Sequence, residues 1–401
     1  MKKNSQYSLL FLLLPSIAET IAASKFSIPV PGSPFTLGRI TFIIVGVSGI
    51  LNNRNFFFNS NTLKGLLLIF LGSMFGALFS NQVGLSLSRS LGTILLLFGS
   101  IGIANLWQLH FFRKFLDLFF ILNLSYWAYY VFDLTISNGT TFVAYSKLFL
   151  DNQAINHHVI GVNASVSSIY IAIRYFYQKE QFKLGGYLIV FIGIITCFLC
   201  ESRSNLLITV FILFFILFIS KVKLSKILLI TIPLFVIIYS LLIGIAENNE
   251  SLFQRFDATD QEYQERTTGM RLDFIVGFIE EFIQNPFGKG VFGSEIKYGN
   301  AQSTMLHNQY LTFMLSGGLF AFIGIFMWIS EFIAVFKYNI RKLNFNQYNF
   351  AIIFSLLTFL LTLLTIEFSG LLFFMFASLF INQSENYLGE KGSRSKKHLN
   401  N

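Results

Sequence analysis

Long apolar runs recur along the whole chain at the spacing of a protein that crosses a bilayer many times. A spanning helix needs about 20 mainly apolar residues, because the hydrocarbon core is roughly 30 Å thick and each helical residue rises about 1.5 Å. Twelve segments fit, namely 7–24, 36–52, 64–80, 87–107, 115–137, 160–177, 184–200, 204–220, 227–246, 308–336, 349–366 and 370–382. The last segment is short, so the count is open by one. The pattern predicts an all-α polytopic membrane protein with about 12 transmembrane helices.

Composition and loop charge agree with this topology. The chain is 54% hydrophobic and only 12% charged, whereas soluble domains carry about 25% charged residues. Lys and Arg accumulate in short loops on the cytoplasmic side of membranes. With Met1 inside, the inner segments hold most of the 29 basic residues, including those at 2–3, 113–114, 221–226 and 391–397. We therefore predict that both termini are cytoplasmic, and we attribute the net charge of +9 to topology rather than to nucleic-acid binding.

One long polar segment interrupts the apolar pattern. Residues 247–307 contain ten of the 20 acidic residues, and the alternation of spans places this segment on the outer face. A tethered loop of this length is usually functional or disordered, and its pattern favours order. The predicted regions are spans one to nine at 1–246, an extracytoplasmic loop at 247–307, spans ten to twelve at 308–382, and a basic cytoplasmic tail at 383–401.

An amphipathic helix is predicted inside this loop at residues 268–284. Thr267 or Thr268 is expected to cap its start, and Asn285-Pro286 to end it. Leu272, Ile275, Ile279 and Phe282 form an apolar stripe that fits either the helix bundle or the membrane interface. Arg271 would then lie in the first turn, where a cation opposes the helix dipole unless an anion compensates it.

Several short motifs in a fixed order resemble one known family. They are Glu201-Ser202-Arg203-Ser204 at an outer mouth, Thr268-Gly269-Met270-Arg271, Asn285-Pro286-Phe287-Gly288-Lys289-Gly290, His307-Asn308-Gln309-Tyr310-Leu311 and Gly317-Gly318-Leu319. Together they resemble the signature of the O-antigen polymerase and ligase family over residues 197 to about 330. The sequence departs from it at Asp273-Phe274, where members often have Trp, and around 160–163, where many have Asn-Pro-Asn.

The resemblance implies a membrane glycosyltransferase of GT-C-like fold in a bacterial inner membrane. Such enzymes take a glycan from undecaprenyl diphosphate at the outer leaflet and transfer it to an acceptor hydroxyl, in the synthesis of O-antigen lipopolysaccharide, capsule or exopolysaccharide. A flippase and a chain-length-regulating co-polymerase are the implied partners. The chain contains no Asp-x-Asp sequence, which nucleotide-sugar enzymes use to hold a metal, so we expect neither a metal nor another cofactor.

The same resemblance, together with residue chemistry, gives candidate site residues. Arg203 and Arg271 are candidates for binding the anionic diphosphate, because a guanidinium is permanently charged and binds phosphate oxygens in bidentate fashion. His307 is the candidate base, since an imidazole titrates near neutral pH. The additional candidates for substrate binding are Arg266, Arg89, Asn308 and Tyr310.

Simpler interpretations stay open for each residue. Arg203 can pair with Glu201, Arg271 with Asp273 or Glu265, and His307 can merely begin a span, while a loop carboxylate such as Glu262 is an alternative base. The neighbouring histidines His157 and His158 are expected in a solvated outer loop, and Cys197 and Cys200 lie in an apolar span without further metal ligands.

Three functions remain compatible with the sequence. A polymerase that joins oligosaccharide repeat units is preferred. A ligase that moves finished glycan to a lipid A core or a protein shares the same motifs. A flippase for lipid-linked oligosaccharides is the third, supported only by charges such as Glu19, Asp117, Asp133 and Glu331 inside predicted spans.

Overall fold

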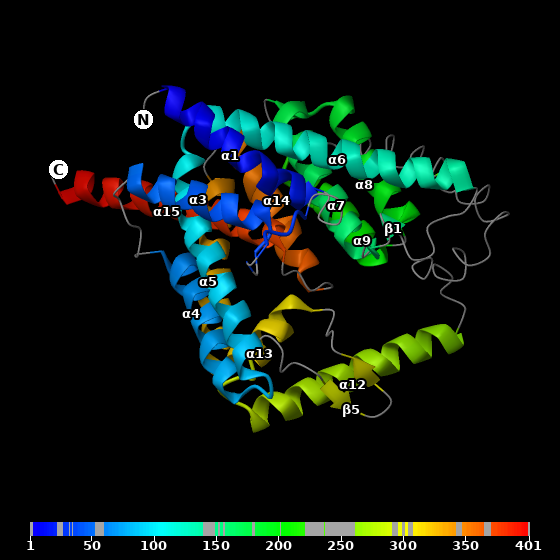
Figure 1. Ribbon diagram of the computed structural model, residues 1–401. Coiled ribbons are helices and arrows are strands. Elements are labelled where there is room, and N and C mark those ends of the chain that lie inside the picture. The colour runs from blue at the N-terminus through cyan, green and yellow to red at the C-terminus, as the bar shows by residue number, and fades with distance from the viewer. Residues whose placement is uncertain are drawn as a thin grey trace. The chain divides into compact units, whose positions relative to one another are not determined.

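The structure is a computed structural model of the full chain (Figure 1). It describes residues 3–21, 27–31, 33, 35–52, 60–138, 149–150, 153–154, 157–178, 181–200, 202–220, 236, 261–290, 296–298, 301–303, 308–341, 347–364 and 370–399. Two compact units can be distinguished. The first unit comprises Met1–Lys114, Glu265–Asn344 and Leu363–Asn401, and the second comprises Phe115–Gln264 and Phe345–Thr362.

Helices dominate the described residues. They are α1 (Lys3–Ile21), α3 (Leu37–Asn52), α4 (Asn61–Gly76), the short 3-10 helix η1 (Ala77–Phe79), α5 (Val83–Leu106), α6 (His110–Asn138), α7 (His157–Phe176), α8 (Leu184–Leu199), α9 (Arg203–Ile219), α12 (Gln261–Gln284), α13 (Gln309–Arg341), α14 (Gln347–Thr362) and α15 (Leu371–Leu399). Three antiparallel hairpins join β1 (Phe149–Leu150) to β2 (Gln153–Ala154), β3 (Tyr177–Gln178) to β4 (Gln181–Phe182), and β5 (Ile296–Tyr298) to β6 (Ala301–Ser303).

The helices follow the predicted spans closely. Every predicted span coincides with a helix except 227–246, which lies outside the described residues apart from position 236. Within the described part, five helical segments are long and apolar enough to cross a membrane. They are Asn61–Phe79, Val83–Leu106, His110–Asp133, His158–Phe176 and Gln309–Arg341. Five further apolar helices are shorter. The helical, polytopic character is confirmed, and the count of twelve spans stays a prediction.

The centre of the first unit is α15. Residues 371–385 of this helix are buried without exception, and α15 contacts α1, α4, α5 and α13. A helix that is apolar all round is expected inside a bundle rather than on its surface, and the run Leu371–Ile381 has this character. The helix continues from the predicted span 370–382 through most of the predicted tail, and Asn382–Glu385 are still buried.

Small residues bring the helices of the first unit into close contact. Gly46 and Gly49 of α3 lie against Gly99 and Gly102 of α5, so these two helices run parallel. In α4 and α13, which lie side by side in Figure 1, Gly65 contacts Gly324 and Gly72 contacts Gly317, so these helices run antiparallel. A side chain at these positions would overlap the neighbouring backbone, which is the usual reason for small residues between membrane helices.

The second unit packs α7 against α8, α9 and α14. At one end, Asp117 of α6 accepts two hydrogen bonds from Arg174 of α7, at 3.0 and 3.1 Å, and a third from the Tyr170 hydroxyl at 2.7 Å. The Asp117 carboxylate is therefore occupied by a structural ion pair, which weakens the flippase interpretation of this intramembrane charge.

Candidate functional site

Arg203 begins a helix at one end of the second unit. The helix α8 ends at Leu199, and after a short turn the helix α9 begins at Arg203 with Ser202 as its N-cap residue. Ser202 is fully buried and Arg203 is half-buried. The first backbone amides of a helix lack intrahelical acceptors and carry a partial positive charge. Arg203 adds a full positive charge at the same place, so this helix start suits an anion.

A buried polar network holds the Arg203 turn in place. The Asn205 side-chain amide donates hydrogen bonds to Ser202 Oγ at 2.7 Å and to the His158 carbonyl at 3.2 Å. His158 Nδ1 lies 3.3 Å from Ser202 Oγ, within hydrogen-bonding distance. The network therefore ties the start of α9 to the start of α7 and fixes the residue immediately before Arg203.

The prediction for the two histidines was wrong. His157 and His158 are the first residues of α7 rather than part of an open loop, and His158 is half-buried beside Ser202. Gly161, one turn further along α7, makes this approach possible because a Cβ atom there would overlap the Ser202 and Asn205 side chains. The only available sequence signal was the pair His158 and Gly161 directly before the apolar run, and two residues are too few to predict this contact.

The amphipathic helix of the long loop is longer than predicted. Helix α12 begins at Gln261 and ends at Gln284, directly before Asn285-Pro286, so the predicted end is confirmed. The predicted start was wrong, because Thr267 and Thr268 lie inside the helix rather than at its N-terminus. Arg271 is accordingly in the third turn, and the predicted conflict with the helix dipole does not arise. Arg266 and Arg271 both belong to this helix; their side chains lie outside the described residues.

Helix α12 presents two apolar stripes rather than one. Phe274, Phe278 and Phe282 pack against the buried Leu315 of α13. Of the two predicted environments for Phe282, the structure therefore shows the helix bundle. Ile275 and Ile279, which the sequence assigned to the same stripe, are 46% and 48% exposed. They form the second stripe together with Val276 and Ile283. Leu272 lies outside the residues whose side chains are described.

The glycine-rich segment after α12 forms a backbone clasp with α13. We use "clasp" for residues 286–290 paired with residues 315–319. Its hydrogen bonds join the Lys289 amide to the Leu315 carbonyl at 2.9 Å, the Gly290 amide to the Ser316 carbonyl at 3.0 Å, and the Leu319 amide to the Pro286 carbonyl at 2.8 Å. The two motifs that flank His307 in the sequence are thus bonded to each other.

Positive backbone angles make glycine necessary in this clasp. Gly288, Gly290 and Gly318 have φ values of 82°, 72° and 57°, and Gly318 interrupts the helical geometry of α13. A Cβ atom on Gly318 would overlap the Pro286 carbonyl. Lys289 also forms an ion pair with Glu281 of α12, so the clasp fastens the end of α12 to the kink in α13.

Two further candidates, Asn308 and Tyr310, occupy structural positions at the start of α13. Asn308 Oδ1 accepts hydrogen bonds from the amides of Tyr310 and Leu311, at 3.0 and 3.2 Å, as a helix cap does. Tyr310 lies in α13, is 8% exposed and has its ring centroid 6.4 Å from that of Trp328. His307, which precedes Asn308, lies outside the described residues.

Arg89 is distant in the sequence from the other candidate residues. It is an exposed residue in the second turn of α5, and it interacts electrostatically with Arg39 of α3. Cys197 and Cys200 form no disulfide and are both fully buried in the second unit.

These features are those of a helical, polytopic membrane protein in which the clasp fastens the amphipathic helix α12 to α13. Residues 188–326 match the family model described as O-antigen ligase. The match supports the resemblance to the O-antigen polymerase and ligase family over this part of the chain. Members of that family are membrane glycosyl-transfer enzymes that act on lipid-linked glycans. No curated protein and no solved structure matches the chain.

Proposed function

We propose that the protein is a polymerase that joins undecaprenyl-diphosphate-linked oligosaccharide repeat units at the outer face of a bacterial inner membrane. The observation that carries the proposal is the family match over residues 188–326, because Arg203, Arg271 and His307 all fall inside it. The product would be an O-antigen, capsule or exopolysaccharide chain, made together with a flippase and a chain-length-regulating co-polymerase.

The reaction needs three chemical operations. The acceptor hydroxyl attacks the anomeric carbon of the donor glycan, a new glycosidic bond forms, and the bond from this carbon to the diphosphate oxygen breaks. His307 takes the hydroxyl proton, and the undecaprenyl diphosphate leaves with the bonding electrons. Arg203 and Arg271 stabilise the charge that develops on the leaving diphosphate through charge-assisted hydrogen bonds. No metal is required for these steps.

The local structure supports these roles in different ways. Arg203 adds its charge to the amides at the start of α9, which is a favourable setting for phosphate oxygens. Arg266 and Arg271 are five residues apart on α12, whose end the clasp fastens. Asn308 caps α13 and thereby fixes the chain immediately after His307, while the buried Tyr310 anchors the same turn. Arg89 is a further candidate for binding the lipid-linked glycan.

A ligase is the second candidate, because the matched family model carries that description. Its acceptor would be a lipid A core or a protein instead of a second lipid-linked glycan. The donor, the two arginines and the base would act in the same way, so the residues described above serve both reactions equally.

Deletion of the gene separates the candidates. Loss of a polymerase leaves single repeat units on the acceptor, whereas loss of a ligase leaves long polymer attached to the carrier lipid. We expect single repeat units. Normal surface glycan in the deletion strain would refute both proposals, and oligosaccharide trapped on the inner leaflet would indicate a flippase.

A further inference from the structure

One side of helix α12 is both apolar and exposed along its C-terminal half. Ile275, Ile279 and Ile283 follow one another at helical spacing, and all three are exposed, Ile283 to 71%. At 3.6 residues per turn they adjoin the stripe that packs against Leu315 of α13, so the two stripes form one wide apolar sector that is only partly covered. Contiguous exposed apolar surface of this kind marks an interaction site.

Four exposed phenylalanine rings connect the end of α12 to two spans. Phe75 of α4, Phe79 of η1, Phe287 of the clasp and Phe320 of α13 form what we call the aromatic cluster. The Phe287 ring centroid lies 5.9 Å from that of Phe75 and 6.3 Å from that of Phe79. The centroids of Phe75 and Phe320 are also 5.9 Å apart. Because Phe287 follows shortly after Ile283, the cluster extends the exposed apolar surface of the spans to the end of α12.

The spans that contribute to the aromatic cluster have apolar outer surfaces. Asn61–Phe79 and Gln309–Arg341 are both long and apolar enough to cross a membrane. The second span also exposes Phe322, Ile323 and Phe326, directly after the cluster in the sequence. Exposed apolar side chains on a spanning helix contact lipid, whose acyl chains are as apolar as a leucine side chain. The exposed side of α12 is therefore continuous with a lipid-facing surface.

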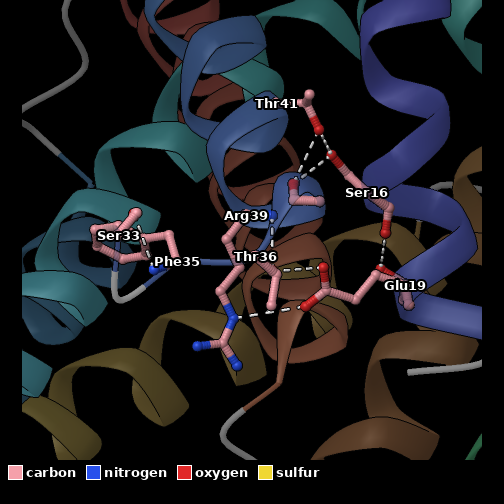
Figure 2. A network of polar contacts seen from close by, with 9 residues as sticks. Ser16, Glu19, Ser33, Phe35, Thr36, Arg39 and Thr41 are labelled. Carbon is pink, nitrogen blue, oxygen red and sulfur yellow. Dashed lines mark hydrogen bonds and ion pairs between the residues drawn. The ribbon is translucent and has the colours of Figure 1, made fainter. Parts of the chain in front are cut away.

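Polar side chains distinguish α12 from the spans. Glu19 of α1 is 5% exposed and paired, because its Oε2 accepts a 2.6 Å hydrogen bond from the Thr36 hydroxyl and its Oε1 lies 3.6 Å from Arg39 Nε (Figure 2). A carboxylate in an apolar setting needs such partners. On α12, in contrast, Glu280 and Gln284 are exposed beside the apolar stripe. Helix α12 thus presents one side suited to lipid and one suited to water, as a helix in the membrane interface does.

The direction of α12 agrees with such a position. Figure 1 shows α12 running across the end of α4 instead of alongside it. The clasp holds the C-terminal end of α12 at this place, where a Cβ atom on Gly76 of α4 would overlap the Gly290 amide. We propose that α12 lies in the plane of the membrane interface, with Ile275, Ile279 and Ile283 in contact with the lipid acyl chains.

Apolar contact, rather than attraction to charged headgroups, provides this binding. The sequence from Asp273 to Gln284 contains no Lys or Arg, so it offers nothing to anionic headgroups. A helix in the plane of the interface keeps all its residues at one depth, which places Arg266 and Arg271 of α12 at the level of lipid phosphates. The diphosphate of the proposed donor lies at the same level. The lipid contact itself does not require the proposed reaction.

The test measures the accessibility of nitroxide labels in the purified full chain, reconstituted in phosphatidylcholine nanodiscs. Labels are attached to Ile279→Cys and Ile283→Cys, and to the matched controls Glu280→Cys and Gln284→Cys on the polar edge of the same turns. The unsubstituted chain is the labelling blank, since its two natural cysteines are fully buried. Oxygen, which concentrates in hydrocarbon, and a water-soluble nickel chelate each relax a nitroxide on collision. We expect oxygen to dominate in the two isoleucine variants and the chelate to dominate in the two controls.

Three results would overturn the proposal. Dominance of the chelate in all four variants would place α12 in water. Low collision rates with both reagents in the isoleucine variants would show that protein covers the stripe, either a second copy or another part of the chain. Oxygen contact that appears only after phosphatidylglycerol is added would show attraction to charged headgroups instead of apolar contact. Because no donor glycan is present, failure of this proposal is separate from failure of the proposed function.

Discussion

The backbone amide of Leu319 donates a 2.8 Å hydrogen bond to the carbonyl of Pro286. This bond joins two sequence motifs that lie on either side of His307, and two further backbone bonds strengthen the pairing. The glycines in both motifs therefore have a structural reason, since they let two backbones meet at the kink of α13. The clasp fixes where α12 ends, and α12 contains Arg266 and Arg271.

Substitution of Gly318 tests the clasp. Gly318→Ala places a Cβ atom against the Pro286 carbonyl and forces alanine into a conformation that is essentially restricted to glycine. Such strained conformations cost about 1–3 kcal/mol before any overlap is counted. We expect faster limited proteolysis near α12 and a loss of surface glycan while the protein still reaches the membrane. Gly84→Ala is the matched control, because nothing lies within 4 Å of a Cβ atom at that position. Equal proteolysis of both variants would contradict the role of the clasp.

Substitution of Arg203 tests the proposed binding site for the leaving diphosphate. Arg203→Lys keeps the charge but loses the planar fork that binds two phosphate oxygens, so we expect a reduced glycan yield, and we expect Arg203→Ala to abolish it. Surface glycan is measured at matched membrane expression. Lys183→Ala, which alters an exposed cation in the same unit, should leave the yield unchanged. Long-chain glycan in Arg203→Ala at the wild-type level would exclude Arg203 from the reaction.

Glu385 gives the fold a pH dependence. It lies three residues past the predicted span 370–382, its carboxylate oxygens are buried without a hydrogen-bond partner, and burial raises its pKa from 4.5 to about 9. The folded state therefore keeps a proton that the unfolded chain loses. The resulting stabilisation is complete below pH 4.5 and is lost as the pH rises towards about 9.

The neutral variant Glu385→Gln removes this dependence. We expect it to unfold at a higher temperature than the wild type at about pH 8 and to differ little at about pH 5, as followed by thermal unfolding in detergent. Glu280→Gln, which alters an exposed carboxylate, should show no such difference between the two pH values. A wild-type stability that rises with pH over this range would show that Glu385 is ionised in the folded protein.

Hydropathy predicted the helices well because a bilayer imposes a minimum apolar length on each span. The end of α12 was also predictable, since Asn285-Pro286 cannot continue a helix. Its start was not, because the polar residues from Gln261 onward are good helix formers and carry no apolar stripe. Likewise, the apolar positions of α12 did not reveal which stripe packs on Leu315, since both follow helical spacing.

Contacts between distant segments were beyond the sequence. The local sequence pattern does not predict the contact of His158 with Ser202. The glycines in the two motifs likewise did not predict the backbone hydrogen bond between Leu319 and Pro286. Arg203 could be predicted as a candidate because its motif is local, whereas the contact of Glu19 with Arg39 joins two helices and has no local sequence signal. Such relationships arise from packing and become visible only once the helices are placed.

The most direct test of the account is glycosyl transfer by the purified full chain in lipid nanodiscs. The reaction contains undecaprenyl-diphosphate-linked repeat units, and its products are separated by length. The account predicts longer glycans on the same carrier lipid with the wild-type chain, and none with Arg203→Ala, Arg271→Ala or His307→Ala. Repeat units that stay unextended by an intact, membrane-inserted wild-type chain, or extension that persists in all three variants, would contradict it.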